Sequence, residues 1–122
     1  MTVKELAANL KNNFSSATVR IIGDPSLKVS SIAYAGAPGY MAHIKLLERD
    51  DVDAVVGGEV PEWESISYVR DAVAQGRKKA MILIGHVNSE EAGMVYCAEW
   101  ISGFIANVPI KFIKAGDSFS YY

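Results

Sequence analysis

Short apolar runs separated by turn residues recur along most of the chain. The runs at residues 54–56 and 81–84 are continuously apolar, which is typical of strands buried on both faces of a sheet. Residues 18–22 are rich in β-branched side chains, and residues 29–35 place apolar side chains between polar ones, so each predicts a strand. Residues 110–113 predict a final strand by the same criterion. The pattern therefore predicts a sheet of short strands.

Apolar residues between these strands recur with helical spacing. Thr2 and Glu5 form a capping box, which predicts an amphipathic helix over residues 2–14. Gly76 is the expected C-cap of a helix that starts at Pro61. The remaining helices are predicted from apolar stripes at three sets of positions: Met41, Ile44 and Leu47; Ile66, Val69 and Val73; Met94, Cys97, Ala98, Ile101 and Phe104.

The order of predicted elements from residue 29 onward is β-α-β-α-β-α-β. Such alternation favours a mostly parallel sheet with right-handed crossovers and helices on both faces, a three-layer α/β/α fold. With 122 residues the chain should form one domain and bury about two-thirds of its unfolded surface. Residues 1–122 are thus predicted to be a single α/β domain, in which helix 2–14 leads into a core at 18–119.

Composition narrows the possible partners. A formal net charge of −2 argues against a nucleic-acid-binding surface, and the run Arg77-Lys78-Lys79 is expected to be a solvated helix end. The single cysteine, Cys97, excludes an internal disulfide and is expected in the core of a protein in a reducing compartment. We find neither a membrane-spanning run nor a signal-peptide pattern. The expected location is the cytoplasm, without membrane contact.

Candidate chemistry lies in the loops that follow the predicted parallel strands, at residues 36–39, 57–59 and 85–90. These loops should meet at the edge of the sheet where α/β proteins bind ligands. Two of them carry reactive groups: Glu59 in one, His86 and Glu90 in the other. If their strands are neighbours, the three side chains converge on one crevice.

His86 and Glu90 are four residues apart, so on a helix their side chains would be neighbours. Ser89 is the expected cap of that helix, which places His86 just before it. An imidazole with a carboxylate suits zinc, manganese or iron, although a catalytic metal site normally has about three protein ligands. Glu59 could act as a general acid or base, or hydrogen-bond to a ligating histidine.

The same residues have simpler interpretations. A turn histidine bonded to backbone, with Glu90 serving only the helix dipole, is the commoner arrangement, and so is an exposed loop glutamate at position 59. His43 lies beside an apolar stripe and is expected at the surface. The loop at 36–39 could cradle a phosphate, but it lacks the spacing of a known nucleotide-binding motif.

Several segments taken together resemble one known family. They are Val-Arg-Ile-Ile-Gly-Asp-Pro at 19–25, Val-Ser-Ser-Ile-Ala at 29–33, Asp-Ala-Val-Val-Gly-Gly-Glu at 53–59 and Gly-His-Val-Asn-Ser-Glu at 85–90. In this order, residues 19–119 resemble the carboxyl-terminal half of the Nif-three-like proteins, also described as dinuclear metal-centre hexameric proteins or GTP cyclohydrolase type-two homologues. The last segment matches the family pattern Gly-His-x-x-Ser/Thr-Glu.

The resemblance implies an α/β fold in which two similar halves build a dinuclear metal site. It implies that His86 and Glu90 are ligands of divalent metal ions (zinc, manganese or iron), and that Glu59 helps to activate water. It further implies a small-molecule substrate and assembly into homo-oligomers.

This chain also departs from the family pattern. The amino-terminal half, with its paired histidines and aspartate ligand, has no counterpart, and Gly57 replaces the usual threonine. The chain offers two of five expected ligands, so we expect no activity or firmly held metal until a missing amino-terminal half or a partner subunit completes the hydrolase- or cyclohydrolase-like site. The alternatives are a non-catalytic oligomerisation or binding module and, by fold analogy alone, a nucleotide-binding flavodoxin-like domain.

Overall fold

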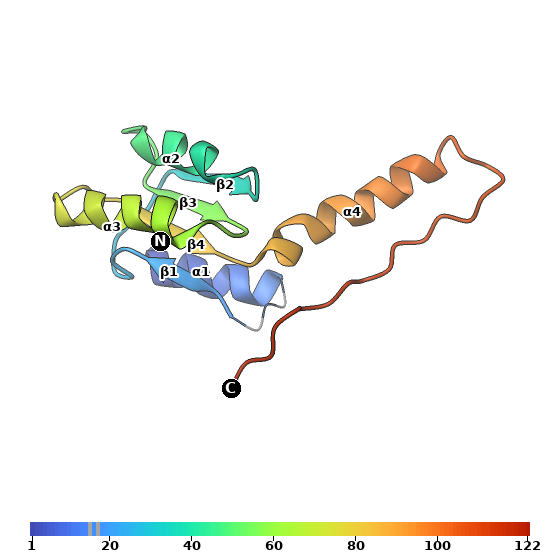
Figure 1. The fold of residues 1–122 in the computed structure, drawn as a ribbon, viewed down its shortest axis with the longest axis horizontal. Coiled ribbons are helices and arrows are strands. Elements are labelled where there is room, and N and C mark those ends of the chain that lie inside the picture. Colours follow the sequence, from blue (N-terminus) through green and yellow to red (C-terminus); the bar gives the residue numbers. More distant parts are fainter. Residues whose placement is uncertain (15, 17) are drawn as a thin grey trace.

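The computed structural model of the chain describes residues 1–14, 16 and 18–122. The elements in chain order are α1 (Val3–Asn13), β1 (Arg20–Ile22), β2 (Ile32–Gly36), α2 (Tyr40–Glu48), β3 (Ala54–Gly57), the π-helical turn η1 (Glu62–Ile66), α3 (Ser67–Ala74), β4 (Ala80–Leu83) and α4 (His86–Ser102). Figure 1 shows a small sheet with helices on both sides, and α4 projecting away from it. The C-terminal segment returns alongside α4 toward the sheet (Figure 1).

The strand order is β1-β4-β3-β2. Strands β2, β3 and β4 are parallel, and β1 pairs with β4 in the antiparallel direction. The predicted three-layer α/β/α class with a mostly parallel sheet is confirmed. Because β3 and β4 are adjacent in the centre, the loops that follow them leave the sheet side by side.

The core has one apolar cluster on each face of the sheet, as expected from alternating side-chain directions. The cluster on the α1 face comprises Val3, Ala7, Val29, Ala54, Val56, Ala80, Ile82 and Ile84. The cluster beneath α2 and α3 comprises Leu47, Val52, Val55, Val60, Val69, Met81 and Leu83. Both central strands are buried on both faces, which is why their sequences are continuously apolar.

The predicted capping box at the start of α1 is confirmed by hydrogen bonds, whereas the C-cap predicted at Gly76 is Gln75, one residue earlier. The Thr2 hydroxyl accepts from the Glu5 amide at 3.2 Å, and the Glu5 carboxylate accepts from the Thr2 amide at 2.7 Å. Gly76 follows the C-cap of α3 with a φ of +82°, in the left-handed region that glycine favours. Both helix ends could be predicted to within one residue, because a few neighbouring residues determine each of them.

The predicted strand at residues 110–113 is wrong. In the described part of the chain this segment is extended but pairs with no strand of the sheet. The position beside β4 is taken by β1, whose predicted strand 18–22 is shortened to Arg20–Ile22. The strand predicted at 29–35 is likewise shorter and begins at Ile32.

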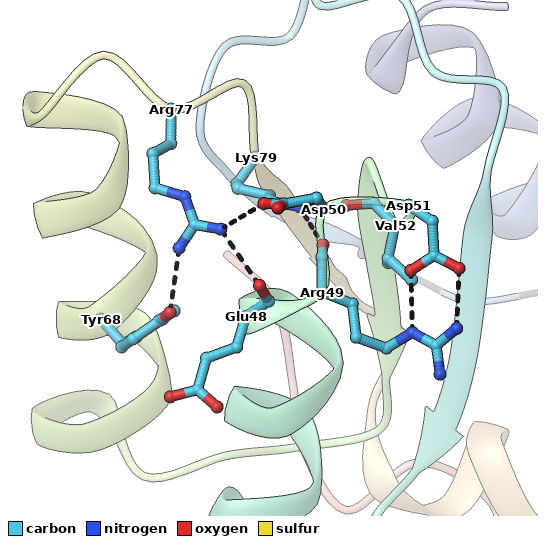
Figure 2. A network of polar contacts seen from close by, with 8 residues as sticks. All are labelled: Glu48, Arg49, Asp50, Asp51, Val52, Tyr68, Arg77 and Lys79. Atoms are coloured by element: carbon cyan, nitrogen blue, oxygen red, sulfur yellow. Dashed lines mark hydrogen bonds and ion pairs between the residues drawn. The ribbon is translucent and has the colours of Figure 1, made fainter.

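Lys79 is buried rather than solvated, contrary to the prediction for the basic run. Its side chain, in a residue only 6% exposed, donates from Nζ to the carbonyl oxygens of Arg49 and Val52, both at 2.5 Å (Figure 2). These carbonyls lie where the chain leaves α2 and approaches β3. The ammonium therefore satisfies the buried carbonyl of Val52 and the partly buried carbonyl of Arg49, which also accepts from the Val52 amide at 3.4 Å.

Arg77 joins the same region from the end of α3. Its guanidinium donates to the Glu48 carbonyl at 3.2 Å and to the Tyr68 hydroxyl at 3.3 Å, and it lies 3.5 Å from Asp50 (Figure 2). Of the three basic residues only Lys78 is exposed, as expected for a solvated helix end.

Helix α4 contains no buried residue. The prediction that Cys97 lies in the core is therefore wrong: its free thiol is only partly covered, and Met94 on the same stripe is exposed. Its end at Ser102, followed by Gly103, agrees with the sequence. Among the described residues, no helix combines the length and the apolar character that crossing a membrane requires.

Candidate functional site

Glu59, His86 and Glu90 lie together at the carboxyl edge of the parallel strands. His86 Nδ1 is 3.1 Å from Glu59 Oε1, and His86 Nε2 is 3.1 Å from Glu90 Oε1. The imidazole thus lies between two carboxylates, one from the loop after β3 and one from the first turns of α4. The expectation that these three side chains converge is met, because their two strands are neighbours.

The position of His86 depends on how α4 begins. Gly85, with a φ of +91°, is the N-cap, so His86 is the first helical residue. The predicted cap at Ser89 is wrong: its hydroxyl donates to the His86 carbonyl at 2.7 Å from inside the helix. The Asn88 amide instead donates to the Ile84 carbonyl at 2.8 Å. Because His86 and Glu90 both lie within α4, their four-residue spacing brings the two side chains together.

Backbone hydrogen bonds tie the three loops of this edge to one another. The Gly58 amide donates to the Gly36 carbonyl at 2.6 Å, and the Gly85 amide donates to the Gly58 carbonyl at 2.9 Å. The Ile84 amide donates to the Gly57 carbonyl at 3.0 Å. Glu59 and His86 each directly follow a residue of this network, so the separation of their backbones is set by it.

The two carboxylates favour the charged form of His86. The hydrogen bond from Nδ1 to Glu59, followed by the charge of Glu90, raises the pKa of His86 above its ordinary value. All three side chains are about half exposed, with His86 at 46%, so solvent weakens the interaction. A proton and a metal ion would compete for the same nitrogen.

The spacing of the donor atoms fits a metal ion. Two ligands of a tetrahedral ion, each bound at about 2.0–2.1 Å, lie roughly 3.4 Å apart. His86 Nε2 and Glu90 Oε1 are 3.1 Å apart, close to that separation. Within the described residues, however, no cluster of three or more His, Cys, Asp or Glu side chains is arranged to hold an ion.

The raised pKa of His86 predicts a pH dependence. We expect replacement of Glu59 by glutamine to move that pKa down toward the ordinary 6.5, because the hydrogen bond to Glu59 is the largest cause. NMR titration of the His86 ring measures this. Since the folded-state pKa is raised, the stabilisation by His86 is present below 6.5 and is lost as pH rises through the folded value.

Glu62→Gln is the matched control, since Glu62 lies near Arg20 rather than near His86. An unchanged His86 titration in Glu59→Gln would mean that the contact between the two side chains does not persist in solution.

A cavity of about 480 Å³ adjoins the imidazole. Glu59 and His86 line one part of it, Arg20 from β1 another, and Asp117 and Tyr121 from the C-terminal segment a third. The Tyr121 hydroxyl donates to Asp117 at 2.8 Å. Asp117 and Tyr121 lie in no motif of the sequence, and Arg20 belongs to the segment 19–25, which gave no sign of a place at this cavity; only the path of the folded chain brings the three residues together.

His43 is buried, so its predicted surface position is wrong. The residue is 0% exposed, and its ring extends from α2 against the loop at residues 36–39. Nδ1 is 3.0 Å from the Gly39 carbonyl and Nε2 is 3.2 Å from the Gly36 carbonyl. Its burial was missed because a polar residue beside an apolar stripe gives no sign of the carbonyl groups that will satisfy it.

Comparisons with known proteins identify the family and the fold of this chain. A family model described as Duf34/NIF3 (NGG1p interacting factor 3) matches residues 1–117. The chain belongs to the Duf34/NIF3 family. Solved structures with the same fold include two of Staphylococcus aureus SA1388, one of them described as a hypothetical protein, and one of a Bacillus cereus protein related to NIF3. A search of curated proteins found no match.

The similarity to these three structures extends over nearly the whole chain. The first SA1388 structure has a TM-score of 0.71 at 22% identity and is matched by 100% of this chain. The second SA1388 structure and the Bacillus cereus protein have TM-scores of 0.63 and 0.62, at 21% and 17% identity, each over 93% of this chain. The matched regions are 40%, 39% and 33% of those chains, so this chain spans well under half their length.

Proposed function

We propose that this chain supplies His86 and Glu90 as ligands to a divalent metal site of a metal-dependent hydrolase or cyclohydrolase-like protein. The observation that carries the proposal is the 3.1 Å separation of His86 Nε2 and Glu90 Oε1, at the edge of the sheet where α/β proteins bind ligands. The adjoining cavity of about 480 Å³ is large enough for a small-molecule substrate.

Glu59 has a separate role in this proposal. Its Oε1 accepts from Nδ1–H of His86, which fixes the tautomer and the ring orientation. The other ring nitrogen, Nε2, then carries the lone pair that can bind a metal ion. The Glu59 side chain is 61% exposed, so its carboxylate is accessible to accept a proton from a substrate or a water. A bound zinc, manganese or iron ion would supply a hydroxide at neutral pH.

The site needs further ligands from outside this chain. A catalytic metal centre has about three protein ligands, and His86 with Glu90 provides two. The match with this chain covers only 40% of one relative of known structure and 33% of another, so both relatives are more than twice as long as this chain. We expect the remaining ligands to come from the other part of such a protein or from a partner subunit, and the chain alone to bind metal weakly and to be inactive.

Calorimetric titration with Zn²⁺ and Mn²⁺ tests the proposal. We expect His86→Ala and Glu90→Gln each to weaken binding at least about tenfold, because either change removes one of two ligands. Glu99→Gln, an exposed carboxylate further along α4, is the control and should bind as the unmodified chain does. Undiminished affinity in His86→Ala, or anomalous scattering from a soaked ion located away from His86, would contradict the proposal.

The second candidate function is assembly, and the bare surface of α4 favours it. Helix α4 and the segment after it project from the sheet as an arm (Figure 1). Its exposed large apolar side chains are Met94, Val95, Tyr96, Trp100, Phe104, Ile105, Val108, Phe112 and Ile113. Aromatic side chains hold about 150–250 Å² each, so the arm exposes on the order of 1,000 Å², comparable with the ~800 Å² per partner of a stable interface.

We propose a second copy of this chain as the partner that covers the arm, since monomeric proteins rarely leave such an area in water. Assembly and metal binding are compatible functions, because His86 and Glu90 lie at the sheet end of α4 and the apolar side chains lie further out.

A further inference from the structure

We infer that His43 is a positioning residue for the candidate site, and that Gly57 is glycine because His43 occupies the space beside it. His43 acts through the backbone at residues 57–58, which leads directly to Glu59. The functional meaning of this placement rests on the proposed role of Glu59, whereas the coupling between His43 and Gly57 can be measured without it.

The first argument is steric. A Cβ atom added at Gly57 would lie 2.7 Å from His43 Nε2, closer than such atoms approach in proteins, and 3.1 Å from His43 Cδ2, a tight contact. Gly57 is buried, and its φ is not in the positive range, so its backbone would accept a side chain. Space, rather than backbone conformation, therefore excludes a side chain at position 57. The imidazole occupies the volume that a side chain at position 57 would need.

The second argument concerns hydrogen bonding. The Gly36 carbonyl accepts from the Gly58 amide at 2.6 Å and also lies 3.2 Å from His43 Nε2. A neutral imidazole carries one N–H, so the buried ring donates either from Nδ1 to Gly39 or from Nε2 to Gly36. In the Nε2–H tautomer, His43 and Gly58 share one acceptor, and the ring holds the carbonyl that binds the backbone next to Glu59.

The steric argument predicts a change of sign in a double-mutant cycle. With His43 present, Gly57→Ala should lower the melting temperature by about 5 °C or more, because the ring or β3 must move. In the His43→Ala background the same change should be neutral or raise the melting temperature, since the space is vacant and glycine costs backbone entropy. Equal effects of Gly57→Ala in both backgrounds would overturn the steric coupling.

The hydrogen-bonding argument is tested with two replacements of similar size. His43→Gln keeps a donor that can reach the Gly36 carbonyl, and His43→Leu fills the space without one. We expect His43→Leu to speed hydrogen exchange of the Gly58 amide at least tenfold and to weaken Zn²⁺ binding, and His43→Gln to retain both within about threefold. A purely space-filling role would make leucine equal or superior to glutamine, which would overturn the positioning role.

The two measurements separate this inference from the proposed function. If the unmodified chain binds no Zn²⁺, the proposed function fails, and the exchange of the Gly58 amide still decides whether His43 holds this backbone. If Zn²⁺ binds and His43→Leu changes neither measurement, the inference about His43 fails and the metal site stands.

Discussion

Replacement of Lys79 by methionine should lower the free energy of unfolding by about 3 kcal/mol, because it leaves buried carbonyl oxygens without a charged donor. Lys79 Nζ donates to Arg49 and Val52 from a position that water does not reach (Figure 2). Methionine has a similar length, so the variant would lose the hydrogen bonds of Nζ without creating a large cavity. Urea unfolding at neutral pH measures the change.

Lys78→Met is the matched control. Lys78 is the exposed neighbour of Lys79 in the same basic run, and its replacement should change the free energy of unfolding by less than about 0.5 kcal/mol. If the two variants lose equal stability, net charge rather than the buried contacts of Lys79 is responsible.

Replacement of Trp100 by glutamate should weaken self-association of the chain about 100-fold. Trp100 is 60% exposed on α4 and packs edge-to-face against Phe104 at 4.8 Å, so the pair forms a rigid aromatic projection. Central aromatic residues of an interface typically contribute about 2–4 kcal/mol, and a buried charge would add a penalty. Sedimentation velocity over a concentration series measures the association constant.

Glu99→Gln on the same turn of α4 is the control and should associate as the unmodified chain does. If the unmodified chain sediments as a monomer throughout the series, assembly is not a function of this chain alone. The exposed surface of α4 would then pack against another part of a longer protein.

Much of the architecture could be predicted because it depends on local or strongly periodic signals. The uninterrupted apolar residues of β3 and β4 identify central strands, and the α/β alternation makes β2, β3 and β4 parallel. Parallel order then brings Glu59 to His86, because the loops after neighbouring strands leave the same edge. The proximity of His86 and Glu90 could also be predicted, because it depends only on their four-residue spacing within one helix.

The features that could not be predicted are polar groups whose partners are distant in sequence. His43 and Lys79 look like surface residues, and each is buried because backbone carbonyls from another element need a donor. The segment at 110–113 has the composition of a strand, but a strand also needs a free edge, and β1 occupies the edge beside β4. Hydrophobic pattern carries no information about either requirement.

Helix α4 joins two regions under different constraints. Its first turns are held to the sheet through Asn88 and carry His86 and Glu90, and its outer turns touch nothing in the described chain that buries them. Substitutions in the outer turns should therefore be tolerated or rejected according to the surface that covers them, independently of the chemistry at the inner end. Among relatives with different partners, the two ends of this one helix should diverge at different rates.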